Sequence, residues 1–175
     1  MSKSRDGKRV GAGQGVALQT PPVARAQMLI RRPVADVFEA FVDPAVTTKF
    51  WFTKSSGRLE PGRDVRWEWE MYGASADVAV KAIEPDARIL VEWSGGGEPP
   101  NQVEWRFDAR PDDTTLVSIT NSGFTGTDDE VVAQALDAQG GFTYLLAGLK
   151  AWLEHGIVLN LVADHVPDAH VDKGA

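Results

Sequence analysis

The chain has no cysteine among its 175 residues. Disulfide bonds, thiol catalysis and cysteine-ligated metals are therefore excluded. A chain without cysteine suits a reducing compartment, and we expect the protein to lie in the cytoplasm. Histidine is also scarce, since only His155, His165 and His170 occur, all near the C-terminus. With so few nitrogen and sulfur ligands the sequence predicts no metal site, and nothing in it indicates a bound cofactor.

Positive charge is in short supply. Lysine and arginine total 18 against 25 aspartate and glutamate residues, which gives a formal net charge of −7. A nucleic-acid-binding domain usually carries a basic face, so this balance argues against a nucleic-acid partner. Long apolar runs are absent as well, because no stretch approaches the roughly 20 residues needed to cross a bilayer. We therefore expect no insertion into a membrane.

The two ends of the chain differ in composition from the part between them. Residues 1–23 are polar and glycine-rich and lack the apolar segment of a secretory signal, so we expect a flexible tail. Residues 24–167 carry the periodic apolar patterns of folded structure and have the size of a single domain. Residues 168–175 are expected to form a C-terminal tail.

The longest periodic segment runs from Thr127 to Gly156 and predicts one amphipathic helix. Thr127 and Glu130 have the spacing of a capping box, and Gly156 has the position of a C-cap. Apolar residues recur at the helical period and form one stripe. The members of this stripe are Val131, Ala135, Ala138, Phe142, Leu145, Leu146, Leu149 and Leu153. A helix roughly 40 Å long with a single apolar stripe requires a broad partner surface.

Two adjacent glycines, Gly140 and Gly141, interrupt this helical pattern. In a helix interior each costs about 1 kcal/mol relative to alanine, so their presence requires a reason. Either they permit close packing or a kink, or they bend the helix so as to widen or gate a cavity beside it. The sequence leaves both interpretations open.

The preceding part of the chain predicts two short helices followed by a sheet. Pro33 suits a helix start, with Val37, Phe38 and Phe41 on one buried stripe, and a second helix is expected near residues 45–52. Beyond it the apolar period changes to 2, the period of strands. The expected strands are 27–31, 64–71, 76–83, 88–93, 103–109 and 114–120. Short turn-forming connections favour antiparallel neighbours, and the whole pattern predicts an α+β fold.

Large aromatic residues share the apolar side of these strands and should face the long helix. Each of them can bury about 150–250 Å² of surface. Either they fill a core, or several of them line an apolar cavity that holds a hydrophobic or aromatic ligand. The residues that we expect to line such a cavity are Trp67, Trp69, Trp93, Trp105, Phe107, Phe142, Leu145, Leu146 and Leu149.

Charged residues of the same strands alternate with the aromatic ones and should point to solvent. They are Glu68, Glu70, Glu104, Arg106 and Asp108. No pair of carboxylates is thus expected inside the cavity for acid–base chemistry, and we assign no catalytic residue. The alternation in 114–120 is ambiguous, because either Leu116 or the pair Val117 and Ile119 could face the helix.

Several segments together resemble a known family. They are VADVFEAFVDPAVTTKFWF, RLEPGRDVRWEWEMYG, VKAIEPDARILVEW, VEWRFDARPDDTTLVSITNSGF and GGFTYLLAGLKAWLEHG. In this order they resemble the family related to the C-terminal domain of activators of the 90-kDa heat-shock-protein ATPase. That family belongs to the SRPBCC superfamily of START and Bet v 1-like domains.

The resemblance implies a helix-grip fold. In this fold a curved antiparallel sheet of about seven strands wraps around the long C-terminal helix, two short helices follow the first strand, and a cavity separates sheet and helix. The resemblance does not imply a shared set of catalytic residues.

Three functions remain as hypotheses. The leading one is a domain that binds a hydrophobic or aromatic small molecule between sheet and helix. One alternative is an enzyme of the polyketide cyclase or dehydratase type, which would need a buried ionisable group. Another is a co-chaperone-like module with a protein partner, which would need an exposed apolar patch, to be sought in residues 157–166. The sequence favours binding over catalysis.

Overall fold

The structure, a computed structural model, describes residues 17–171. In this part of the chain seven strands form one antiparallel sheet in the order β1-β7-β6-β5-β4-β3-β2. The strands are β1 (Ala24–Ile30), β2 (Lys54–Ser55), β3 (Asp64–Trp69), β4 (Ala74–Glu84), β5 (Arg88–Ser94), β6 (Asn101–Ala109) and β7 (Thr115–Ser122). The first strand pairs with the last, and the others form a meander between them.

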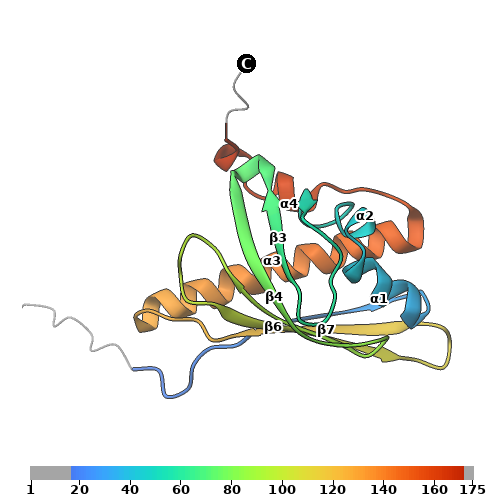
Figure 1. Ribbon diagram of the computed structural model, residues 1–175, viewed down its shortest axis with the longest axis horizontal. Coiled ribbons are helices and arrows are strands. Elements are labelled where there is room, and N and C mark those ends of the chain that lie inside the picture. Colours follow the sequence, from blue (N-terminus) through green and yellow to red (C-terminus); the bar gives the residue numbers. More distant parts are fainter. Residues whose placement is uncertain (1–16, 172–175) are drawn as a thin grey trace, which may run out of the picture.

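One long helix lies across the sheet, and short helices lie beside its C-terminal half and near the upper ends of β3 and β4 (Figure 1). The helical elements are α1 (Val34–Val42), α2 (Pro44–Thr47), η1 (Glu70–Tyr72), α3 (Asp128–His155), α4 (Leu161–Asp164) and η2 (Pro167–Ala169). In Figure 1 the sheet is strongly curved, so that β3 and β4 rise steeply past α3 while β6 and β7 run along it. This is the helix-grip arrangement, and the prediction of an α+β, Bet v 1-like fold is confirmed.

Two local predictions need correction. The helix expected near residues 45–52 ends at Thr47, and the chain continues to Trp51 in hydrogen-bonded turns that direct Phe50 and Trp51 inward. Strand β2 was not predicted, because two residues are too few to show a period. The ambiguous phase of β7 is resolved, since Val117 and Ile119 are buried whereas Leu116 is only half-buried.

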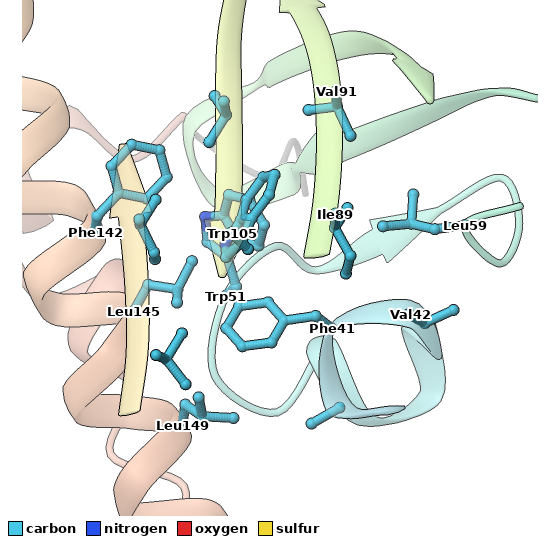
Figure 2. Packing of buried hydrophobic residues seen from close by; sticks show 14 of the residues in the cluster. Phe41, Val42, Trp51, Leu59, Ile89, Val91, Trp105, Phe142, Leu145 and Leu149 are labelled. Carbon is cyan, nitrogen blue, oxygen red and sulfur yellow. The ribbon is translucent and has the colours of Figure 1, made fainter. Parts of the chain in front are cut away.

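A packed core fills the space between the second half of α3 and the sheet. Phe142, Leu145 and Leu149 project from the helix toward Trp105 and Trp51, as Figure 2 shows. Helix α1 closes the same end, where the ring of Phe41 lies 5.6 Å from that of Phe107 and 6.1 Å from that of Trp105. The apolar stripe of the long helix and the inward faces of the strands thus meet as the alternation predicts.

Both ends of α3 are fixed by local chemistry. The predicted capping box is present, because the Thr127 side chain accepts from the Glu130 amide and the Glu130 carboxylate accepts from the Thr127 amide. At the other end Gly156 takes up the left-handed conformation of a C-cap, with φ of 66°. The predicted limits of the helix are confirmed.

An ion pair also attaches the last turns of α3 to β1. The Glu154 carboxylate accepts from the Arg31 amide at 2.7 Å and from Lys150 Nζ at 2.5 Å, and Lys150 also donates to the Leu29 carbonyl. The Glu154 side chain is only 8% exposed although it lies off the apolar stripe. Burial alone would raise the pKa of Glu154, but the hydrogen bonds from Lys150 and Arg31 more than offset it, so this pKa lies below its ordinary value.

Replacing Glu154 by glutamine tests this attachment. A carboxyl whose pKa is lowered by folding stabilises the fold above its ordinary pKa, and this contribution disappears as the pH falls through the lowered value. Glu154→Gln should therefore lower the free energy of unfolding at neutral pH by about 1–2 kcal/mol, and less in acid. Urea denaturation across pH measures this. Glu60→Gln, at an exposed pair with Arg63, is the control with little expected effect. A loss that does not depend on pH would contradict the assignment.

A close approach of α3 to the chain after α2 requires glycine at position 148. A Cβ atom there would lie 3.1 Å from Phe50 Cβ and 3.3 Å from the Phe50 carbonyl oxygen. Gly148→Ala should therefore destabilise the protein by about 1 kcal/mol or more, even though alanine favours a helix. Gly140→Ala is the matched control, because a Cβ at Gly140 meets nothing within 4 Å. It should stabilise the fold by up to about 1 kcal/mol, and equal effects of the two changes in urea denaturation would contradict the packing argument.

Candidate ligand-binding site

A cavity of about 810 Å³ lies beside the first half of α3. Its walls come from the ends of β3, β5 and β7, from the starts of β4 and β6, and from the segment that contains α4 and η2. It is open to solvent on one side, where exposed residues such as Glu98 and Leu136 border it. The packed core and this cavity occupy successive lengths of the same helix.

Four large aromatic side chains that pack against one another form one part of the apolar cavity wall. They are Trp51, Trp69, Trp93 and Phe142. The rings of Trp93 and Phe142 are stacked, with centroids 6.0 Å apart and an angle of 23° between their planes. Trp51 lies 6.0 Å from both Trp69 and Trp93, so the four rings hold one another in place.

The predicted lining residues fall into two groups. Trp69, Trp93 and Phe142 border the cavity. The other six do not border it and are buried in the packed core: Trp67, Trp105, Phe107, Leu145, Leu146 and Leu149. The two interpretations of the aromatic face, core and cavity, thus apply to different parts of the same sheet. Trp51 was missed, because it lies outside the alternating strands on which the prediction was based.

Small residues account for the hollow. On α3 the cavity is bordered by Ala138, Gly140 and Gly141, whereas further along the helix leucines fill the corresponding space. A Cβ atom built at Gly140 or Gly141 would meet no heavy atom within 4 Å, so these glycines do not serve close packing. On the sheet side Ala74 and Ala76 are equally short. The cavity therefore follows from residues too small to fill it.

Polar contacts join three cavity residues. The indole nitrogen of Trp93 donates to Asn101 Oδ1 at 2.5 Å. Asn121 Nδ2 donates to the same oxygen at 2.6 Å and to the Gln102 carbonyl at 2.9 Å. Asn121 is only 1% exposed. Both asparagines were missed, although Asn121 continues the inward series of Val117 and Ile119, and an asparagine on an apolar face is itself a signal.

The carboxylates and the histidine that border the cavity lie at its mouth. Glu98, Asp137 and His165 are exposed, and the described lining contains no lysine or arginine. The charged strand residues point away from the cavity, as the alternation predicted. Glu104 is an example: its carboxylate accepts hydrogen bonds from Arg88 and Arg106 on the outer face of the sheet, so it cannot reach a ligand in the cavity. Burial favours a higher pKa for Glu104, but these two partners bring it below its ordinary value.

The segment after α3 closes one side of the cavity. The Tyr72 hydroxyl donates to the carbonyls of Val162 and Ala163, and the Val171 amide donates to the Met71 carbonyl at 2.9 Å. The ring of His165 lies 4.5 Å from that of Tyr144 on α3. Residues 168–171, expected as the beginning of a tail, therefore pack against η1. The remainder of that tail and residues 1–16 lie outside the described residues.

Residues 17–171 provide neither a cluster of metal ligands nor a membrane-spanning helix. No three histidine, aspartate or glutamate side chains come together there as a metal site would require. None of the helices in the same range combines the length and the apolar character of a membrane span.

Comparisons with known proteins place the chain in a family. The profile of the family described as "Activator of Hsp90 ATPase homolog 1-like protein" matches residues 31–154. Among solved structures, protein SSP2350 from Staphylococcus saprophyticus is 30% identical, with a TM-score of 0.65 over 79% of this chain and 96% of that one. No protein with a curated description matches.

Two structures with lower sequence identity share the fold. The Aha1 dimer from Colwellia psychrerythraea has a TM-score of 0.67 and 18% identity, over 77% of this chain and 98% of that one. DynU16, a protein of the dynemicin biosynthetic locus, has a TM-score of 0.68 and 24% identity, over 78% of this chain and 48% of that one. The profile match spans well over half of the sequence, and the chain belongs to the family of Activator of Hsp90 ATPase homolog 1-like proteins.

Proposed function

We propose that the protein binds an apolar or aromatic small molecule in the cavity beside α3. The observation that carries this proposal is the aromatic wall of Trp51, Trp69, Trp93 and Phe142 around a space that small residues leave unfilled. Ligand pockets in proteins commonly measure about 300–1,000 Å³ and combine mostly apolar walls with a few polar groups. A cavity of about 810 Å³ with two asparagines fits this description.

Catalysis is supported less well than binding. An enzyme of the cyclase or dehydratase type would need an ionisable group held close to the substrate. The carboxylates and the histidine that border the cavity, Glu98, Asp137 and His165, are all exposed at its mouth. Of the two tyrosines in the wall, Tyr144 is also exposed, and the Tyr72 hydroxyl is already bound to the carbonyls of Val162 and Ala163. The enclosed part offers aromatic rings and amides. These groups bind and orient a ligand, and we assign them no proton-transfer role.

A protein partner is the second candidate function, and one surface favours it. Ile157, Val158 and Leu159 follow α3 directly and are 50%, 45% and 44% exposed. Three consecutive exposed apolar residues are typical of a contact surface. This surface adjoins the segment that closes the cavity, so the two candidate functions are compatible. For both we propose a cytoplasmic location, with which a chain free of cysteine agrees.

Titration with 1-ethylpyrene tests the binding proposal. Pyrene absorbs where tryptophan emits, so a probe beside Trp51, Trp69 and Trp93 should receive their excitation energy. We expect saturable energy transfer at a ratio of one probe to one protein. Gly141→Leu places a side chain in the cavity and should weaken binding at least about tenfold, the equivalent of roughly 1.4 kcal/mol of contact.

The matched control is Gln139→Leu, two residues away on the same helix. Gln139 is exposed and does not border the cavity, so this change adds the same side chain outside the site. It should leave the affinity for 1-ethylpyrene unchanged. Energy transfer that never saturates, or equal affinity in Gly141→Leu and the unmodified protein, would refute binding in this cavity.

A further inference from the structure

We infer that Asn101 and Asn121 form a recognition site for a neutral, carboxamide-like group of the ligand. Such a group presents a hydrogen-bond acceptor and a donor side by side, as primary amides, lactams and ureas do. The inference rests on the proposed function, since it concerns the polar part of the same cavity. The aromatic wall would bind the rings of the ligand. The two asparagines would discriminate among ligands of similar shape.

Trp93 determines how both amides are oriented. The indole N–H can only donate, so the atom of Asn101 that faces it at 2.5 Å is the oxygen, Oδ1. The atom of Asn121 that lies 2.6 Å from this oxygen must then be the nitrogen, Nδ2, which also reaches the Gln102 carbonyl. The usual ambiguity between oxygen and nitrogen in an asparagine side chain is therefore removed by the chemistry of its neighbours.

Each amide consequently keeps one unused end. Two side-chain amides that paired fully would exchange two hydrogen bonds, but here only the bond from Asn121 Nδ2 to Asn101 Oδ1 is formed. Among the described residues Asn101 Nδ2 has no acceptor and Asn121 Oδ1 has no donor. The pair thus offers one donor group and one acceptor.

These unused atoms are open to the cavity. Of the described side-chain nitrogen and oxygen atoms, only Trp105 Nε1 is both sealed from solvent and without a partner. The free atoms of Asn101 and Asn121 are therefore not sealed, and both residues border the cavity. Asn121 as a whole residue is 99% buried, so only a small part of its side chain is accessible from the cavity. An amide end in such an enclosed place is poorly solvated, and a ligand with the complementary group supplies the partner that it lacks.

The charged residues around the cavity determine which net charge a ligand should carry. Glu98 and Asp137 stand at the mouth, and no lysine or arginine belongs to the described lining. An anionic ligand would have to pass two carboxylates and lose its hydration without a cation to replace it. A carboxylate also has no donor for Asn121 Oδ1. Neutral amides should therefore bind better than carboxylates of the same shape.

Three pyrene derivatives of similar size test this inference. 1-Pyrenecarboxamide presents a donor and an acceptor, 1-ethylpyrene presents neither, and 1-pyrenecarboxylate presents acceptors and a charge. Affinities are measured by energy transfer from tryptophan. With the unmodified protein we expect the carboxamide to bind at least about tenfold more tightly than either of the other two, because only it pairs with both free amide ends.

Asn101→Asp is the decisive variant. The aspartate still accepts from Trp93 and Asn121, but its second oxygen replaces the free donor of Asn101. The preference for the carboxamide over 1-ethylpyrene should then disappear. Gln139→Glu is the matched control, because it makes the same amide-to-carboxylate change on α3, at an exposed position that does not border the cavity. It should retain the preference.

The outcomes separate this inference from the function on which it rests. If all three probes bind saturably with equal affinity, or if Asn101→Asp keeps the tenfold preference, recognition by the two asparagines is refuted while binding in the cavity stands. If no probe binds, the proposed function fails and the inference fails with it. A preference that is lost in Asn101→Asp and kept in Gln139→Glu supports both.

Discussion

The indole ring of Trp51 connects the packed core with the aromatic wall of the cavity. Its ring lies between 4.7 and 6.4 Å from six other aromatic rings, which belong to the sheet, to α3 and to the neighbouring Phe52. Trp51 belongs to the packed core, where it lies beside Trp105 (Figure 2). It also borders the cavity. The turns after α2 that direct it inward are held against α3 at Gly148. The core therefore supports the aromatic wall that a ligand would contact.

The difference between core and cavity arises from side-chain size along a single helix. The second half of α3 carries leucines that reach the sheet, and its end is attached to β1 through Glu154. The residues of the first half that border the cavity include Ala138, Gly140 and Gly141, which are too short to fill it. The two glycines beside the cavity, Gly140 and Gly141, cost α3 about 2 kcal/mol relative to alanine, which the well-capped and well-packed remainder of the helix can support. The space thus has an identifiable energetic cost.

Much of this fold was predictable because its signals are long and periodic. The stripe of α3, its capping box and the alternation of five strands each involve many residues, and the resemblance to a family added the number of strands. The site was less predictable. Trp67 and Trp93 have the same sequence signal, a tryptophan on the apolar face of a strand, yet one is in the core and the other borders the cavity. Which of them faces the cavity depends on the size of residues far away in the sequence, such as Gly141. The alternation along one strand contains no information about these residues. Asn121 was overlooked because the phase of its strand was ambiguous.

The central claim, that the cavity beside α3 is the binding site, is tested most directly by a crystal structure of the protein with 1-pyrenecarboxamide. The account predicts the pyrene against Trp69, Trp93 and Phe142, with the carboxamide at hydrogen-bonding distance from Asn101 and Asn121. A cavity that contains only water, with the compound on the exposed residues 157–159, would contradict it. That result would favour a surface that contacts a protein partner.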